Sequence, residues 1–240
     1  MPGQQAPGEQ GSGGQGLGGQ GLAERLARVD GAIADAARAA GRDVGELTRI
    51  VVTKFHPAEL VRELVALGVR DVGENRHQEA VAKAAELSDL ELNWHFVGQL
   101  QSNKAKAVRA YAAAVHSVDR ASLADALAGE APLDVFLELN LTGDPARGGV
   151  DPERMQQLAE RVLSTSGLVL RGVMAVAPLD EEPRAAFERV RAASESLMRI
   201  APAATAISAG MSGDFREAIL EGATHLRIGT AITGKRPTPG

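Results

Sequence analysis

The chain has 240 residues and a formal net charge of −5, with 44% hydrophobic and 24% charged residues. This composition is ordinary for a globular protein, and the mild negative charge argues against nucleic acid or an anionic membrane as a partner. The chain has no cysteine, which excludes disulfides, thiolate metal sites and a cysteine nucleophile. No apolar stretch approaches the roughly 18 residues that a membrane-spanning helix needs.

Residues 1–21 differ in composition from the rest of the chain, with nine Gly, five Gln and no Lys or Arg. Such a segment buries too little apolar surface to offset its ordering entropy, which predicts a disordered tail. It also lacks the basic and apolar regions of a secretory signal, so we expect a cytoplasmic protein. Residues 22–240 are expected to form one domain.

The predicted elements alternate between helix and strand along the rest of the chain. A leading helix over 22–40 ends at Gly41, a β-branched run over 48–53 follows, and a helix over 58–67 ends before Gly68. The remaining predicted strands are 70–73, 92–97, 113–118, 133–141, 168–177, 205–208 and 224–228. The predicted helices between them are 78–87, 103–109, 121–127, 152–163, 183–200 and 214–220.

Each strand is followed by a connection long enough for a parallel crossover, which indicates a parallel sheet. Eight such strands in one domain of this length predict an α/β fold of the (β/α)8, or TIM, barrel type. An open doubly wound sheet is the structural alternative. It is less favoured because no GxGxxG motif follows the first strand.

The first strand ends in an unusual lysine. Reactive residues of a parallel barrel lie at the C-terminal ends of its strands, and Lys54 comes directly after the run Val51-Val52-Thr53. The chain has 21 Arg and only five Lys. Lys54 either extends its charge to solvent at the rim or serves as an amine that forms an imine with a carbonyl compound.

The seventh and eighth strands both end in loops that suit a phosphate group. The segments 208–214 and 227–230 are rich in Gly, Ser and Thr, and Ser212 is placed to cap the next helix. Ordinary turn chemistry explains either loop alone. The eighth strand neighbours the first in a closed barrel, so the two loops together with Lys54 predict a phosphorylated aldehyde as ligand.

Six motifs in this order resemble those of the pyridoxal phosphate homeostasis protein family (YggS/PROSC-like). They are VVTKFHP at 51–57, DVGENRHQE at 71–79, WHFVGQLQSNK at 94–104, VHSVDR at 115–120, GVMAVAP at 172–178 and the run from Ser208 to Gly234. The resemblance implies a barrel like the alanine racemase N-terminal domain (PLP fold type III), without the C-terminal β domain of the racemases.

The resemblance also implies a cofactor and the residues that hold it. The cofactor is pyridoxal 5′-phosphate (PLP), held as an imine on Lys54, with Arg227 facing the pyridine nitrogen. The implied cofactor-binding residues are Lys54, Asn75, Ser208, Met211, Ser212, Arg227, Gly229 and Thr230. The sequence departs from commoner family members at Ala209 and Thr233, which lie near the expected phosphate wall and bear on the affinity for PLP.

The function implied by the family is PLP homeostasis, meaning storage, delivery or buffering of the cofactor, with no catalytic residue. The alternative is a PLP-dependent amino-acid racemase, which needs a second acid or base on the cofactor face opposite the lysine. The chain's only tyrosine, Tyr111, precedes the fourth predicted strand and is expected away from Lys54. A sugar-phosphate enzyme without PLP would retain the phosphate loops but leave the motif match unexplained.

The five histidines do not lie at the spacings that are typical of metal ligands, so no metal site is expected. His95 alternates with Trp94 and Phe96 and is expected as a hydrogen-bonded core residue. PLP and, transiently, PLP-dependent apoenzymes are the expected partners, and a monomer is expected with a dimer as the alternative.

Overall fold

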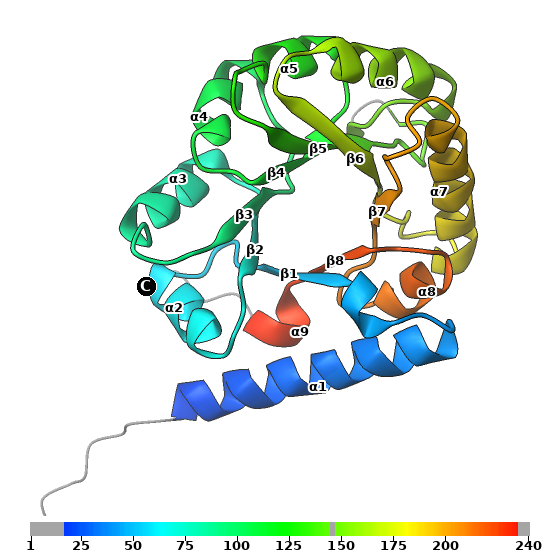
Figure 1. Ribbon diagram of the computed structural model, residues 1–240. Helices are drawn as coiled ribbons and strands as arrows, with labels where there is room; N and C mark the ends of the chain where they lie inside the picture. Colours follow the sequence, from blue (N-terminus) through cyan, green and yellow to red (C-terminus); the bar gives the residue numbers. More distant parts are fainter. Residues whose placement is uncertain (1–16, 145–146, 235–240) are drawn as a thin grey trace, which may run out of the picture.

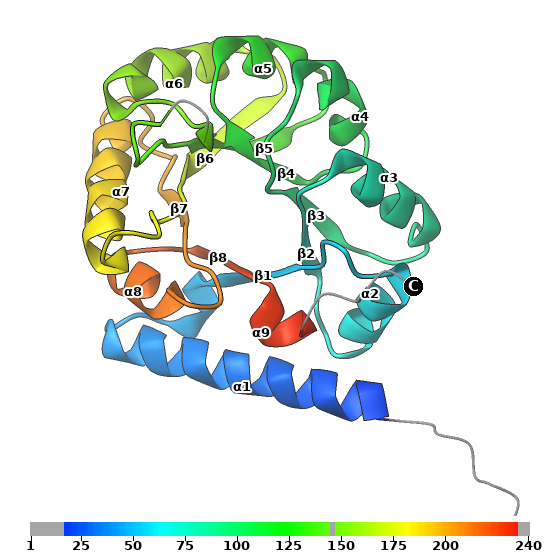
Figure 2. The same cartoon turned by 180° about the vertical axis from the view of Figure 1, so that it is seen from behind.

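The strands of the molecule form a closed barrel. The computed structural model describes residues 17–144 and 147–234. Eight parallel strands follow one another in chain order around the ring, and β1 pairs with β8 to close it, as Figures 1 and 2 show from the two ends. They are β1 (Thr48–Val52), β2 (Asp71–Glu74), β3 (Asn93–Phe96), β4 (Ala114–Val118), β5 (Leu133–Glu138), β6 (Leu168–Met174), β7 (Ala206–Ser208) and β8 (His225–Ile228). The predicted barrel is confirmed, and the open sheet is excluded.

Helices surround the barrel at the predicted places. They are α1 (Leu17–Ala39), α2 (Ala58–Ala66), α3 (His77–Glu86), α4 (Ala105–Arg109), α5 (Ala121–Ala126), α6 (Met155–Ser164), α7 (Pro183–Met198), α8 (Phe215–Leu220) and α9 (Thr230–Thr233). Three short 3-10 helices are η1 (Val44–Glu46), η2 (Ser102–Lys104) and η4 (Pro152–Arg154). Within the described part of the chain, none of these helices is both long and apolar enough to cross a bilayer.

The outer helices pack through one apolar face each, as α2 illustrates. Its buried residues Ala58, Val61 and Leu64 recur at helical spacing and pack against the strands. The helix ends before Gly68, which has φ +89°, a left-handed conformation that favours glycine. The predicted end of this helix is therefore confirmed.

The inside of the barrel differs from the layer between strands and helices. The outer layer is mainly aliphatic with a few aromatic residues, whereas imidazole rings and Phe136 meet in the interior. The ring of His116 lies 4.3 Å from that of Phe136, and Phe136 lies 5.1 Å from His225. Barrels of this type usually fill their interior with branched aliphatic residues, so the histidines indicate a polar interior with hydrogen bonds to satisfy.

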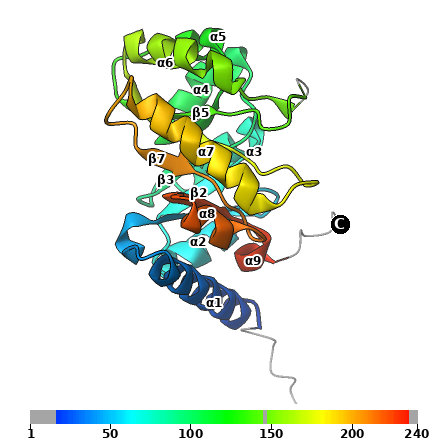
Figure 3. The same cartoon turned by 90° about the vertical axis from the view of Figure 1, so that its right-hand side faces the viewer.

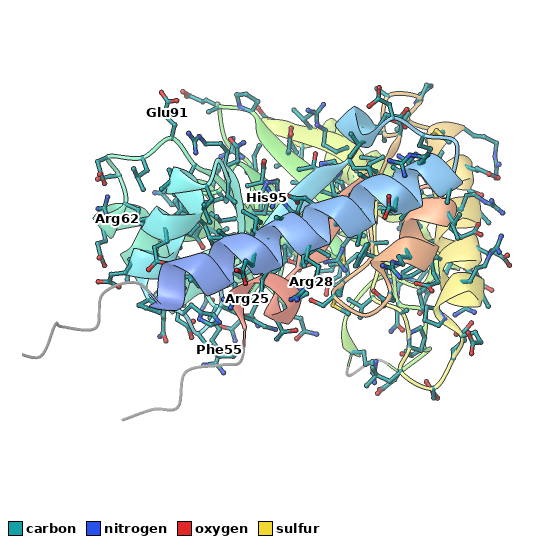
Figure 4. All side chains as sticks on the ribbon, turned by 90° about the horizontal axis from the view of Figure 1, so that it is seen from below. Arg25, Arg28, Phe55, Arg62, Glu91 and His95 are labelled. Carbon is teal, nitrogen blue, oxygen red and sulfur yellow. The ribbon has the colours of Figure 1, made fainter. Side chains whose placement is uncertain are left out.

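Helix α1 runs across the outside of the barrel beside α8 and α9 (Figure 3). The Nε of Arg25 donates a hydrogen bond to the carbonyl of Ile232 in α9 at 2.6 Å, and Figure 4 shows Arg25 next to that short helix. The helix begins at Leu17, so the last five residues of the segment expected as a tail are helical. Extending an existing helix needs no new nucleus. The rest of the expected tail, residues 1–16, lies outside the described residues.

Candidate functional site

The loop that carries Lys54 follows β1 at the C-terminal rim of the barrel. Lys54 is exposed, whereas the neighbouring Thr53 is fully buried. The Thr53 hydroxyl donates to Glu74 Oε1 at 2.7 Å, and the Thr53 carbonyl accepts a hydrogen bond from Lys83 Nζ at 2.8 Å. The backbone immediately before Lys54 is therefore fixed to β2 and α3.

Phe55, the residue after Lys54, is also held by specific contacts. Phe55 has φ +67° and is the one non-glycine residue with positive φ among those the structure describes. Its N–H donates to Glu79 Oε2 at 3.0 Å, and the Arg76 guanidinium carbon lies 4.8 Å from its ring centroid. A strained backbone persists only where its surroundings impose it, and such positions cluster at functional sites. The backbone on both sides of Lys54 is thus fixed by contacts with β2 and α3.

A buried ion pair supports this loop from behind. Lys83 Nζ lies 2.6 Å from Glu74 Oε1, and the side chains are 9% and 1% exposed. Burial raises the pKa of Glu74, and the hydrogen bond and charge of Lys83 oppose this effect. Because Lys83 is held by two oxygen atoms, it is not placed to react with a carbonyl compound as Lys54 is.

Asn75 follows β2 and offers an unused acceptor. Its side-chain Oδ1 is buried and has no hydrogen-bond partner among the described residues. The loop after β3 passes very close to it, since a Cβ at Gly98 would lie 2.2 Å from the Asn75 carbonyl oxygen. A buried acceptor without a protein partner is costly unless a ligand or water satisfies it, so Asn75 fits a position that contacts a ligand.

The loops after β7 and β8 are joined through Ser212. Its Oγ accepts a hydrogen bond from the N–H of Ala231 at 3.3 Å. The predicted role of Ser212 as the cap of the next helix is wrong, because α8 begins at Phe215 and is preceded by Asp214. The carboxylate of Asp214 instead accepts from the N–H of Met211 at 2.6 Å and organises the turn. The Ser212 hydroxyl therefore bridges two loops at the rim.

Two glycines in these loops leave space beside the backbone. A Cβ at Gly229 would meet no described atom closer than the Val52 Cβ at 3.7 Å, and one at Gly213 would meet none within 4 Å. Neither glycine has a positive φ, so the fold itself does not require glycine at either position. Open space next to backbone N–H groups is what a phosphate group needs.

Arg227 extends from β8 through the barrel interior and is 5% exposed. Its Nη1 donates to Ser208 Oγ at 2.7 Å, and its Nη2 donates to the carbonyl of Ala175 at 2.8 Å. Ala175 directly follows β6, so the guanidinium lies at the C-terminal end of the barrel. Burial lowers the pKa of Arg227 to about 10, an effect opposed by Asp214 and Glu138, and the group stays charged at neutral pH.

The structure brings all eight predicted site residues to four adjacent strands. Lys54 follows β1 and Asn75 follows β2, while the other six lie on or after β7 and β8: Ser208, Met211, Ser212, Arg227, Gly229 and Thr230. The order around the ring is β7, β8, β1 and β2. Within residues 17–144 and 147–234, no cluster of three or more acidic or histidine side chains could hold a metal ion.

Tyr111 precedes β4 and lies in the layer between strands and helices, where its ring reaches the start of α3. Its ring stacks on that of His77 at a centroid distance of 6.1 Å and packs against the core between strands and helices. Its hydroxyl is buried with no partner among the described residues. Burial, together with the charge of Glu74, raises the pKa of Tyr111, so the group is a poor acid or base.

Glu138, the last residue of β5, is a partly buried carboxyl group near Arg227 that the sequence did not single out. Its Oε2 is buried without a partner among the described residues. Burial raises the pKa of Glu138 to about 7, with a further rise from Asp119 and an opposing effect of Arg227. The rule that singled out Lys54, a charged residue at a strand end, does not find it, because the predicted strand continues to residue 141.

The raised pKa of Glu138 predicts a pH-dependent stability. A carboxyl whose pKa is higher in the folded state stabilises that state below its unfolded pKa, and this contribution is lost as the pH rises toward 7. We expect Glu138→Gln to increase the free energy of unfolding by about 1–3 kcal/mol at pH 8 and to change it little at pH 4.5. Urea unfolding at both pH values measures the difference, and an equal effect at both would contradict it.

Comparison with known proteins assigns the chain to a family. The family model for the alanine racemase N-terminal domain matches residues 32–237. A solved alanine racemase from Corynebacterium glutamicum has the same fold over 89% of this chain and 60% of its own, with a TM-score of 0.66 and 14% identity. The chain belongs to the alanine racemase N-terminal domain family.

Its more similar relatives define one branch of that family. A pyridoxal phosphate homeostasis protein of Pseudomonas aeruginosa is 45% identical over 222 residues, which are 89% of this chain and 95% of the relative. The structure of PipY from Synechococcus elongatus with PLP bound is 37% identical, covers 89% of this chain and 100% of its own, and has a TM-score of 0.76. The branch to which the chain belongs is that of the pyridoxal phosphate homeostasis proteins.

Proposed function

We propose that the chain binds PLP at the C-terminal rim and acts in PLP homeostasis, by storage, delivery or buffering, rather than as a dedicated enzyme. The observation that carries the proposal is the convergence of Lys54, the buried Arg227 and two open glycine loops on three adjacent strands. The name of the Pseudomonas relative and the PLP in the PipY structure support it.

The residues present fit the cofactor. Lys54 would supply the amine that attaches to its aldehyde, and Asn75 Oδ1, which has no partner among the described residues, would offer an acceptor. The loops with Gly213 and Gly229 provide room for the phosphate group. When bound, PLP supplies an electron-withdrawing ring.

Arg227 decides how strongly that ring draws electrons. A cation facing the pyridine nitrogen keeps the nitrogen unprotonated and makes the ring a weaker electron sink. The guanidinium is fixed by two hydrogen bonds and is buried. This arrangement restrains carbanion chemistry and favours a holding role over a racemase, which is also the role for which the curated relatives are named.

The attachment is tested by adding PLP, reducing with borohydride and mapping the modified peptide by mass spectrometry. We expect a yellow complex and one reduced adduct, on Lys54. A colourless protein, or an adduct on one of the other four lysines, would contradict the proposed attachment.

The phosphate loops give a second prediction. Ser212→Ala combined with Gly229→Val is expected to weaken PLP at least about tenfold, the loss of roughly one charge-assisted hydrogen bond, and to leave pyridoxal nearly unchanged. A Cβ at position 229 has room in the protein, since its nearest atom would be 3.7 Å away. Equilibrium binding of both ligands measures this, with Ser166→Ala at the opposite rim as control. Equal losses for the two ligands would refute the assignment.

We extend the proposal to the cellular location of the protein and to its protein partners. A homeostasis protein must meet the enzymes that use its cofactor, so we propose a cytoplasmic monomer that contacts PLP-dependent apoenzymes transiently. The homeostasis name of the relatives supports this.

A further inference from the structure

A chain of hydrogen bonds runs through the barrel from Arg227. Ser208 Oγ, which accepts from Arg227, lies 2.8 Å from His116 Nδ1. His116 Nε2 lies 3.0 Å from His95 Nδ1, and His95 Nε2 lies 3.0 Å from Asp71 Oδ1. Three of the five residues are nearly or fully inaccessible to solvent: Ser208, His116 and Arg227. We call these five residues the polar column.

The polar column connects the two rims of the barrel. Arg227 reaches the carbonyl of Ala175 at the C-terminal end of β6. Asp71 is the first residue of β2 at the other rim, where its side chain is 28% exposed. Figure 4 shows His95 between Glu91, on the loop that leads into β3, and Phe55 at the opposite rim.

The hydrogen bonds of the column run in one direction when both imidazoles are neutral and Asp71 is ionised. Arginine only donates, so Ser208 Oγ accepts from Arg227, and a carboxylate only accepts, so His95 donates through Nε2 to Asp71. His95 Nδ1 is then the acceptor for the Nε2–H of His116, and His116 Nδ1 accepts from the Ser208 O–H. In this arrangement both imidazoles are Nε2–H tautomers, and every donor points from the cation toward the anion.

The charged groups around the column do not change the direction of its hydrogen bonds. Burial lowers the pKa of His116 well below its usual range and lowers that of His225 to about 4. Burial alone would raise the pKa of Asp71, but its hydrogen bonds with His95 and Asn93 bring the pKa below its usual value. The other charged groups facing the column are Arg171, near His225, and Asp214 and Glu138, near Arg227.

We propose that Asp71, His95, His116 and Ser208 are positioning residues that hold the Arg227 guanidinium in place and transmit the charge of the Asp71 carboxylate to it. Each donor in an aligned chain strengthens the next bond, and the effect is larger in a medium of low dielectric constant. The carboxylate thereby makes Ser208 Oγ a better acceptor for Arg227 and lowers the positive potential at the cofactor ring. This inference rests on the proposed PLP site, toward which Arg227 is directed.

The first experiment uses the protein without cofactor and so does not depend on the proposed function. Nitrogen-15 NMR of the histidine rings assigns the tautomer of each. We expect His95 and His116 as neutral Nε2–H tautomers at pH 7. An Nδ1–H tautomer of His116, or a doubly protonated ring at either position, would overturn the column.

The second experiment measures the pH midpoint of the visible absorption band of the PLP complex. Asp71→Asn keeps the shape of the side chain and removes its charge, so the potential near the ring becomes more positive. We expect the midpoint to fall by roughly half a pH unit. Asp30→Asn is the matched control, because Asp30 lies at the same rim but pairs with Arg49 outside the column, and it should leave the midpoint unchanged.

A double variant separates transmission through the column from direct charge attraction. His116→Phe interrupts the column without changing a charge, and in that background Asp71→Asn should no longer shift the midpoint. Additive shifts, an unchanged midpoint in Asp71→Asn, or an equal shift in Asp30→Asn would overturn the proposal. If His116→Phe does not fold, two results still test the proposal. They are the difference between Asp71→Asn and Asp30→Asn in the pH midpoint, and the tautomers of the two histidines. A wild-type protein that gives no PLP band would refute the PLP site, while the tautomers still test the column.

Discussion

Replacing Lys54 is expected to abolish covalent attachment of PLP. Lys54→Ala removes the amine, so the yellow band and the borohydride-reduced adduct should both be lost. The fold should persist with a change in free energy of unfolding within about 0.5 kcal/mol, because the side chain is exposed at the rim. Absorption spectra, mass spectrometry and urea unfolding of the same preparation measure the three quantities.

Lys54→Arg separates covalent chemistry from charge attraction. Arginine keeps the positive charge and a long side chain, but its guanidinium stays protonated and cannot serve as the attaching amine. We expect the same loss of band and adduct, with weak binding retained through the loops after β7 and β8. Lys106→Arg, an exposed substitution on α4, is the matched control and should behave like wild type. A persistent adduct in Lys54→Arg would contradict the assignment of Lys54.

Breaking the buried pair behind the loop is expected to have the largest effect on stability. Lys83→Met leaves the Glu74 carboxyl without its cation in a site where it is 1% exposed. Losing one partner of a buried pair costs about 3–5 kcal/mol. The deficit should be larger at pH 8 than at pH 5, since an unpaired Glu74 is more easily accommodated when protonated. Urea unfolding at the two pH values measures it.

A double substitution identifies the cause of this loss. Glu74→Met with Lys83→Met leaves no buried charge, so it should recover part of the stability that Lys83→Met loses. Both variants should bind PLP more weakly than wild type, because the hydrogen bond from Lys83 to the Thr53 carbonyl next to Lys54 is missing in each. A double variant as unstable as Lys83→Met would show that lost packing, rather than an unpaired charge, is responsible.

The sequence predicts the barrel well because local patterns suffice for it. Each predicted strand is found, mostly within one residue at each end, but two end three residues earlier than expected. The fifth ends at Glu138 because the Asn140 side chain accepts hydrogen bonds from the N–H groups of Thr142 and Gly143, which turns the chain. The sixth ends at Met174. The alternation of side chains and the apolar content of the sequence continue past Glu138 and Met174, so neither signal reveals where strand pairing stops.

The side-chain contacts inside the barrel could be predicted less well from the sequence. Alternation correctly places His95 on the face opposite Trp94 and indicates a hydrogen-bonded core residue, which its bonds to His116 and Asp71 confirm. The identity of those partners depends on the stagger between strands far apart in the chain, and no local pattern encodes it. The conformation of Phe55 was also beyond prediction, since its positive φ is imposed by contacts with α3.

The docking of α1 onto α8 and α9 also has a consequence for synthesis. Helix α1 finds its partners α8 and α9 far along the chain, and β1 likewise closes the barrel against β8. At about 5–20 residues per second, the stretch from the end of α1 to the start of α9 takes roughly 10–40 s to synthesise. Throughout that time the apolar face of α1, with Leu22, Leu26, Val29 and Ile33, lacks the two helices that cover it in the folded protein. The barrel can therefore close only after β8 has been synthesised.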